Sequence, residues 1–231
     1  MRYLFLSVVL GLVVCGCGGS RDDAAGGDGE GGKLIGATLI TQTHVFYQDM
    51  VAAMQEEAVK NNFRLSIRYA ENDGAAQNNH IGTFITQGVD AIILAPCDSD
   101  AIAPAVEEAT RAGIPVFTAD IAAHNAPVVC HVASDNVQGG RLIGEYLAKL
   151  LDNQGKVAIV DYPEVASVQD RVAGFEEVMN AHEGLTVVQK ISGQGQRDRA
   201  HKATQDLLQS RQDIDAIFGI NDDSALGALA A

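Results

Sequence analysis

Short apolar runs alternate with longer amphipathic segments along most of the chain. The runs lack the alternation of apolar and polar side chains that is typical of a sheet with one face in water, so they indicate parallel strands covered by helices on both faces. The sequence therefore predicts an α/β protein with doubly wound parallel sheets. We expect strands at residues 34–40, 64–69, 91–95, 115–119, 128–133, 157–160, 185–191 and 216–220.

The segments between these runs are predicted to be helices, joined to the strands by right-handed crossovers. Asp98 or Ser99 is expected to cap the third helix, and Gly113 to end it. The expected helices cover residues 46–61, 75–87, 98–112, 137–151, 168–181, 198–210 and 222 onward.

The segment at residues 129–136 separates two series of strand–helix units. An apolar strand runs into a polar Ser-Asp-Asn turn, and a long amphipathic helix follows. We therefore predict an N-terminal α/β lobe at residues 33–135 and a C-terminal α/β lobe at residues 136–231. Two lobes with a crossing between them imply a cleft, which is a place for a ligand.

The first 17 residues are predicted to be an export signal. Arg2 precedes an apolar run at residues 3–14 that is too short and wrongly flanked for a transmembrane helix. The Cys15-Gly16-Cys17 sequence resembles a bacterial lipoprotein lipobox, and Cys17 is the better candidate for lipidation because the small Gly16 precedes it. Plain secretion with cleavage nearby is the alternative.

Residues 18–32 are predicted to form a flexible tether. Seven of these fifteen residues are glycine and four are acidic, so the segment cannot bury enough apolar surface to become ordered. With a lipid on Cys17, the folded part would be held at the periplasmic face of a bacterial membrane by this anchor alone.

The last predicted helix contains the apolar sequence at residues 225–231 and stops without a glycine cap, a proline or a polar exit. We therefore expect the natural chain to continue beyond Ala231 and the second lobe to be incomplete. A frayed natural terminus is the alternative.

The charge of the chain excludes one class of partner. The formal net charge of −14 argues against nucleic-acid binding, because no basic stripe is present to neutralise phosphates.

The two remaining cysteines are not expected to form a disulfide. Cys97 and Cys130 belong to strands with one strand expected between them, which puts them ~10 Å apart, too far for a disulfide. We predict two free thiols and a monomeric protein.

Ligands of open parallel sheets bind beyond the carboxyl ends of the strands. These positions are rich in Asp, Asn, Gln and aromatic residues, and Gln169 and Arg171 lie at the start of a helix. Such groups suit a neutral polyol, because each hydroxyl both donates and accepts, and a sugar ring stacks on an aromatic face. The strand-end candidates are Thr41, Gln42, Thr43, His44, Phe46, Tyr47, Asn72, Asp73, Asp98, Asp120, Ile121, Asp135, Asn136, Asp161, Tyr162, Gln194, Gln196, Asn221 and Asp222.

Motifs for catalysis or cofactor binding are absent from the sequence. There is no Gly-x-Ser-x-Gly elbow and no P-loop, and the Gly-Gln-Gly at residues 193–195 lacks the third glycine of a dinucleotide fingerprint. His44, His124 and His131 are not spaced as metal ligands. We therefore expect no enzymatic activity, no catalytic residues, no cofactor and no metal.

Structural roles are an alternative explanation for several candidates. Asp73, Asp98 and Asp222 are expected to cap helices or form turns. His131, inside a strand, is expected to be a packed histidine.

Three further candidates carry most of the site hypothesis. The alternative for Phe46 is a core position in the first helix. The alternative for Arg171 is an ion pair with Glu176 or another acidic residue at the surface. Asp120 is harder to explain structurally, because it ends a buried strand and is followed by an apolar residue rather than by a helix that it could cap.

Four motifs together make residues 33–231 similar to the type I periplasmic sugar-binding proteins, in particular to the ribose-binding branch. The resemblance implies two lobes that close on a ligand and are joined by three crossing strands. The segment at residues 129–136 would be the first crossing, with the lobes pivoting at Asp135 and Asn136. The motifs are Pro96-Cys97-Asp98-Ser99-Asp100-Ala101, His131 to Asn136 with Gly139-Gly140, Arg171-x-x-Gly174-Phe175, and Asn221-Asp222 with Ala225 to Ala228.

The resemblance also implies roles for individual residues. Asp120, Arg171 and Asn221 would contact sugar hydroxyls. Phe46 and Tyr47 would stack on the sugar ring, opposite an aromatic residue of the other lobe.

Three positions depart from the ribose-type pattern, and each lies in the implied site. His44 stands in place of Asn, Ile121 in place of Arg, and Gly195 in place of the second-lobe aromatic. These changes remove a charged donor and one face of the aromatic sandwich, so the expected ligand is a sugar or polyol other than ribose. His44, Ile121 and Gln169 complete the set of ligand-binding candidates.

The function implied by the resemblance is that of a lipoprotein that captures a small sugar or polyol by hinge closure and delivers it to the permease of an ABC importer. The alternative is a sensor that presents the ligand to a histidine kinase or chemoreceptor. A LacI-type repressor shares the fold, but here an export signal replaces the DNA-binding helices.

Overall fold

The computed structural model describes residues 32–231. The predicted signal, Cys17 and all but the last residue of the predicted tether lie outside this range.

Within residues 32–231, all strands are parallel, as predicted. They form one sheet in each half of the sequence, and the first sheet has the order β2-β1-β3-β4-β5. Its strands are β1 (Leu34–Leu39), β2 (Arg64–Tyr69), β3 (Ala91–Leu94), β4 (Val116–Ala119) and β5 (Cys130–Val132).

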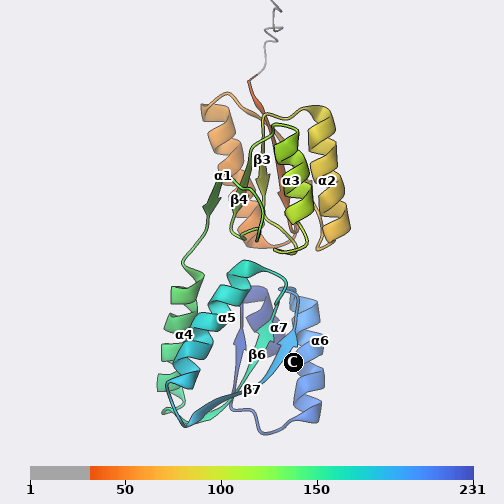
Figure 1. Ribbon diagram of the computed structural model, residues 1–231. Coiled ribbons are helices and arrows are strands. Elements are labelled where there is room, and N and C mark those ends of the chain that lie inside the picture. The colour runs from red at the N-terminus through yellow and green to blue at the C-terminus, as the bar shows by residue number, and fades with distance from the viewer. Residues whose placement is uncertain (1–31) are drawn as a thin grey trace, which may run out of the picture. The chain divides into compact units, whose positions relative to one another are not determined.

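Helices cover both faces of the first sheet (Figure 1). These are α1 (Val45–Lys60), α2 (Gly74–Gln87) and α3 (Ala103–Arg111). Tyr47 and Val51 of α1 belong to the same apolar cluster as Leu39 of β1. On the opposite face, Phe84 of α2 and Val106 of α3 pack in a second cluster with the central strands. This double coverage explains why the strands are apolar on both faces.

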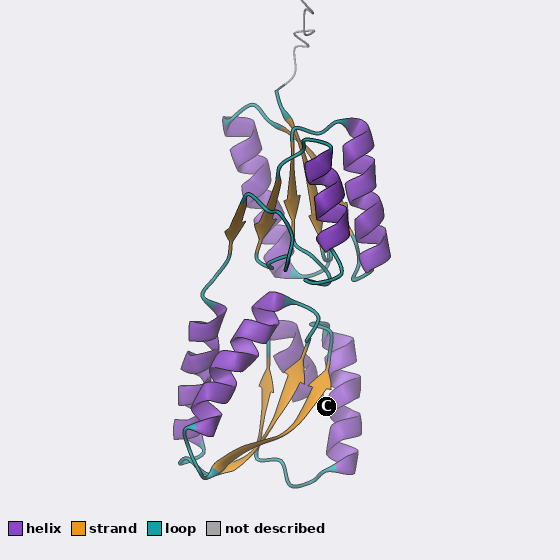
Figure 2. Ribbon diagram, in the orientation of Figure 1, coloured by secondary structure: helices purple, strands orange, loops and turns teal. Residues whose placement is uncertain are grey.

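The second sheet has the order β7-β6-β8 and is built in the same way (Figure 2). Its strands are β6 (Gly155–Asp161), β7 (Leu185–Ser192) and β8 (Ala216–Gly219). Its helices are α4 (Asn136–Leu150), α5 (Ala166–Asn180), α6 (Arg197–Ser210) and α7 (Asp222–Ala230). The central strand β6 is fully buried at residues 157–160. Phe175 of α5 stacks on Phe218 of β8 with ring centroids 4.4 Å apart, which fixes α5 against the sheet.

Helices α4 and α5 approach so closely that glycine is required at their contact. A Cβ on Gly140 would lie 1.9 Å from the carbonyl oxygen of Arg171, and one on Gly174 would lie 2.0 Å from that of Val137. Both distances are far below van der Waals contact, so no other residue fits without moving a helix.

The chain passes from the first sheet to the second through residues 133–135. Asp135 caps α4, because its Oδ1 accepts a hydrogen bond of 2.9 Å from the backbone N–H of Gln138. The Nδ2 of Asn136 donates to the carbonyl of Ser134. The two residues predicted as a pivot therefore fix the start of α4, and their role as a hinge stays a prediction.

The structure corrects three of the predicted structural roles, and for Asp98 it rejects the helix cap but confirms the turn. Helix α3 begins at Ala103, not at Asp98 or Ser99, because Pro104 sets its first turn. Asp98 instead closes a turn by accepting from the N–H groups of Asp100 and Ala101. The other two corrections concern Asp222 and His131.

Helix α7 is capped by Asn221, and Asp222 lies in its first turn, where a carboxylate is favourable near the helix N-terminus. His131 is exposed rather than packed, because β5 is the edge strand of its sheet, and its Nδ1 pairs with the Thr118 hydroxyl at 2.9 Å. Asp73 does cap α2, as expected.

One further prediction can be compared with residues 32–231. Cys97 and Cys130 are free thiols, the first buried and the second exposed, with β4 between β3 and β5 as expected. None of the described helices is both long enough and apolar enough to cross a membrane.

Candidate functional site

A cavity of about 910 Å³ lies at the carboxyl ends of both sheets. The loops after β1, β2 and β4 line it from the first half of the sequence, and α5 and the loops after β6, β7 and β8 line it from the second. This is the location expected for a ligand of open parallel sheets. Seven of the eight predicted ligand-binding residues line the cavity: His44, Phe46, Tyr47, Asp120, Ile121, Arg171 and Asn221.

Asp120 and Tyr47 form a hydrogen-bonded pair in this cavity. The Tyr47 hydroxyl donates to Oδ2 of Asp120 at 3.0 Å, and the Tyr47 side chain is buried. Burial raises the pKa of Asp120, while the Tyr47 hydroxyl and the positive charge of Arg171 act to lower it. Burial, and then the nearby Asp120 carboxylate, raises the pKa of Tyr47 well above its usual value. The raised pKa of Tyr47 keeps its hydroxyl protonated as a donor, and Asp120 accepts the hydrogen bond from it.

The backbone of Asp120 supports a functional role. Its φ of 69° lies in the left-handed region, which non-glycine residues seldom adopt. The main chain turns here directly after β4, and Ile121, which is 2% exposed, fills the space beside it. Strain of this kind, maintained by packing, is typical of functional positions.

Arg171 reaches the cavity from α5. Its Nη2 donates to Oδ1 of Asn136 at 2.5 Å, and its Nη1 donates to the carbonyl of Ile220. The alternative pairing with Glu176 is wrong, because Glu176 pairs with Lys190 at 2.9 Å. Two anchoring hydrogen bonds leave the remaining N–H groups of the guanidinium for a ligand.

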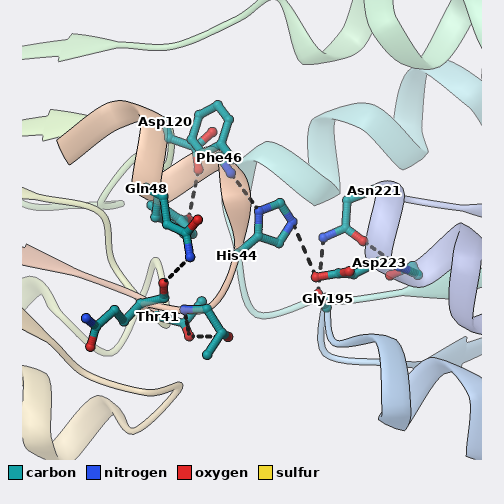
Figure 3. A network of polar contacts seen from close by, with 12 residues as sticks. Thr41, His44, Phe46, Gln48, Asp120, Gly195, Asn221 and Asp223 are labelled. Carbon is teal, nitrogen blue, oxygen red and sulfur yellow. Dashed lines mark hydrogen bonds and ion pairs between the residues drawn. The ribbon is translucent and has the colours of Figure 1, made fainter. Parts of the chain in front are cut away.

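Asn221 has a structural role in addition to its predicted one. Its Oδ1 accepts from the N–H of Ser224 at 2.8 Å and so caps α7, and its Nδ2 donates to the carbonyl of Gly195 at 3.2 Å. Each group retains one further hydrogen-bonding position. The cap therefore fixes the orientation of the amide at the cavity wall (Figure 3).

His44 caps α1 and lies opposite a carboxylate of the second half. Its Nδ1 accepts from the N–H of Phe46 at 3.1 Å, which assigns the proton of a neutral ring to Nε2. Nε2 lies 3.7 Å from Oδ2 of Asp223 on α7 (Figure 3). His44 thereby connects the two sides of the cavity.

Phe46 is not a core residue, so that alternative is wrong. Its side chain is 44% exposed at the cavity, and its ring meets the Tyr47 ring edge-on at a centroid distance of 5.3 Å. Gln169 does not line the cavity, because its exposed side chain donates to the carbonyl of Pro163 at 2.8 Å.

Two further residues line the cavity. Glu71 was not among the strand-end candidates, and Tyr162 was a strand-end candidate left out of the predicted binding set. Glu71 follows β2 by two residues, and its carboxylate accepts from the Thr41 hydroxyl at 2.9 Å. Tyr162 follows β6, and its hydroxyl donates to the carbonyl of Cys97 at 3.2 Å. The signal for both was their position just beyond a strand.

The lining has the chemistry of a binding site for hydroxyl groups. It combines carboxylates, amides, guanidinium groups and an exposed aromatic ring. In residues 32–231, no cluster of three or more His, Cys, Asp or Glu side chains is arranged to hold a metal ion.

The family model of the periplasmic binding protein domain matches residues 35–231. The chain belongs to the type I periplasmic binding protein family. The ribose import binding protein of Bacillus subtilis is 37% identical over 198 residues, which are 85% of this chain and 64% of that protein. This periplasmic binding protein thus spans less than two thirds of the length of that relative.

Solved structures of the family resemble this periplasmic binding protein closely. An ABC transporter solute-binding protein from Bacillus halodurans with bound myo-inositol has a TM-score of 0.80 at 32% identity, over 88% of this chain and 72% of that one. The fructose-binding periplasmic domain of a hybrid two-component system has a TM-score of 0.80 at 25% identity, over 86% of this chain and 66% of that one.

Proposed function

We propose that this periplasmic binding protein captures a neutral sugar or polyol in the cavity and delivers it to an ABC importer. The observation that carries the proposal is the Asp120–Tyr47 pair, a half-buried acceptor and a buried donor beside the exposed ring of Phe46. A sugar needs both kinds of group for its hydroxyls and an apolar surface for its ring. The relatives bind ribose and myo-inositol, which agrees with this class.

The charge of the lining favours a neutral ligand over an anionic one. Carboxylates outnumber guanidinium groups in the cavity, so a phosphate or a sugar acid would meet a net negative surface. The carboxylates belong to Glu71, Asp120, Asp198, Asp222 and Asp223, and the guanidinium groups to Arg171, Arg197 and Arg199.

Isothermal titration of the full-length protein with matched pairs tests the ligand class. D-ribose and myo-inositol are each compared with their monophosphate esters. The proposal expects that one or more neutral compounds in a panel of pentoses, hexoses and polyols binds, and that its phosphate ester binds more weakly. Binding of the esters alone would contradict it.

In this account, Asp135 and Asn136 act as the pivot of ligand-induced closure, and a lipid on Cys17 holds the protein at the periplasmic face of the membrane. The capping of α4 by Asp135 supports the pivot, because it makes the helix start rigid directly after the crossing. Metabolic labelling with a radioactive fatty acid tests the anchor. Label should enter the protein and should be lost in Cys17→Ser.

The second candidate function is a sensor that presents the ligand to a histidine kinase. The structural similarity to the periplasmic domain of a two-component system favours it. Deletion of the gene distinguishes the two functions. Loss of uptake of the bound sugar supports import, whereas normal uptake with a lost transcriptional response supports sensing.

A further inference from the structure

Helix α5 carries Arg171 into the cavity, but it has no N-terminal cap of its own. Its N-cap residue is Val165, whose side chain cannot accept a hydrogen bond. The first residues of the helix, Ala166, Ser167 and Val168, are all buried. The N–H of Ala166, the first residue of the helix, has no partner within the helix, so it needs an acceptor from elsewhere in the protein.

Ser99 supplies this acceptor from the other lobe. Its Oγ accepts a hydrogen bond of 2.8 Å from the N–H of Ala166, and the side chain of Ser99 is completely buried. Ser99 thus occupies the chemical role of an N-cap residue, although it lies 67 residues earlier in the sequence.

The backbone around Ser99 is fixed within the first lobe. Asp98 closes the turn by accepting from the N–H groups of Asp100 and Ala101, and the carbonyl of Ser99 accepts from the N–H of His124 at 2.7 Å. The hydroxyl is therefore presented to α5 from a rigid loop.

Two more hydrogen bonds join the same two segments. The N–H of Ser99 donates to the carbonyl of Glu164 at 2.9 Å, and the hydroxyl of Tyr162 donates to the carbonyl of Cys97 at 3.2 Å. Together with the cap, residues 97–99 of the first lobe hold residues 162–166 of the second. Ser99 and Ala166 do not line the ligand cavity.

We propose that Ser99 is a positioning residue for ligand binding, which caps α5 from the opposite lobe and thereby holds Arg171 at the cavity. The proposal rests on the proposed function, because it assigns Ser99 an effect on sugar affinity without contact to the sugar. The cap forms only when the two lobes are in contact, so it links that contact to the orientation of the binding guanidinium.

Ser99→Ala in the full-length protein tests the proposal, with two readouts. The first is the affinity, by isothermal titration, for the panel sugar that the unmodified protein binds most tightly. We expect Ser99→Ala to weaken it about 3- to 10-fold, as for the loss of one buried hydrogen bond. The second is the amide exchange rate of Ala166 by NMR, which we expect to rise about 10-fold in the sugar-bound variant.

Ser210→Ala is the matched control. The Ser210 hydroxyl also makes one hydrogen bond, to the carbonyl of Leu207, at the far end of α6. Ser210→Ala should change neither the sugar affinity nor the exchange rate of Ala166. Ser99→Cys, which keeps the side-chain size and weakens the acceptor, should act in the same direction as Ser99→Ala and replaces it if the alanine variant does not fold.

Unchanged affinity in both Ser99 variants would overturn the positioning role, even if Ala166 exchanges faster. Unchanged exchange of Ala166 would overturn the cap itself. An equal loss of affinity in Ser210→Ala would also contradict the proposal, because the effect would not depend on the lobe contact. If no sugar binds to the unmodified protein, the proposed function fails and the positioning role of Ser99 fails with it. If a sugar binds with equal affinity to the unmodified protein and both Ser99 variants, only the positioning role fails.

Discussion

The hydroxyl of Tyr47 donates a hydrogen bond of 3.0 Å to Oδ2 of Asp120, and this bond ties α1 to the end of β4. The other carboxylate oxygen, Oδ1, accepts no hydrogen bond from the described residues. It is therefore available to a hydroxyl of a ligand. The strained backbone of Asp120, with a φ of 69°, presents this oxygen at the cavity.

Tyr47→Phe should weaken sugar binding about 3- to 10-fold and lower the free energy of unfolding by about 1 kcal/mol, because the half-buried Asp120 loses its donor. Titration calorimetry and urea denaturation measure the two effects. Tyr146→Phe is the control, since Tyr146 is 63% exposed on α4 and should change neither. Equal effects of both substitutions would contradict the assigned role of Tyr47.

Asp120→Asn should stabilise the fold at neutral pH while weakening sugar binding. Burial raises the pKa of Asp120 in the folded state, so ionisation costs more in the folded than in the unfolded protein. The contribution of Asp120 to the stability of the unmodified protein therefore falls as pH rises from the usual value of 3.8 through the raised folded pKa.

The stability difference between Asp120→Asn and the unmodified protein should grow across that pH window and be smallest below it. Urea denaturation at a series of pH values measures the difference. A difference that does not change with pH would show that Asp120 has no raised pKa in the folded protein.

Arg171→Lys should lower the free energy of unfolding by about 1–3 kcal/mol, because an ammonium cannot satisfy both the Asn136 amide and the Ile220 carbonyl in the geometry of a guanidinium. It should also weaken sugar binding. Arg141→Lys is the control, since Arg141 pairs with Glu177 at the exposed surface, where a pair contributes about 0–1 kcal/mol. The prediction is wrong if the two lysine variants are equally stable.

Adjacent glycines of α4 should respond in opposite directions to alanine. Gly140→Ala should destabilise the fold by several kcal/mol, on the order of other overpacked sites, because its Cβ would overlap the carbonyl of Arg171. Gly139→Ala should stabilise it by about 0.5–1 kcal/mol, since nothing lies within 4 Å of the added Cβ and alanine favours helix. Thermal denaturation of both variants measures the two changes in stability. Similar melting temperatures would contradict the close α4–α5 packing.

The fold could be predicted from the sequence because parallel strands buried on both faces produce an unmistakable pattern. The runs around β1, β3 and β6 are apolar without alternation, and the helices between them are bounded by residues such as Asp73 and Gly113. The first residue of a helix was harder to predict where two sequence signals, a capping residue and a proline, compete. Asp98 has the chemistry of a cap, but Pro104 decides where α3 begins.

The sequence could predict only those parts of the site that the ends of the strands position. Residues two apart on a helix point about 200° from each other, so Gln169 and Arg171 cannot both face the cavity. Residues five apart on a helix point about 140° from each other, so Arg171 does not pair with Glu176. The guanidinium is held by Asn136 and Ile220 instead, which no local pattern reveals. Ser99 is buried because the second lobe packs on it, which no local pattern reveals.

The most direct test of the account is a paired titration of the unmodified protein and Asp120→Ala with a panel of neutral pentoses, hexoses and polyols. The account predicts that the unmodified protein binds one or more of these compounds, and that Asp120→Ala weakens the tightest interaction by about 1–3 kcal/mol. Absence of binding to every compound, or equal affinity of the two proteins, would contradict it.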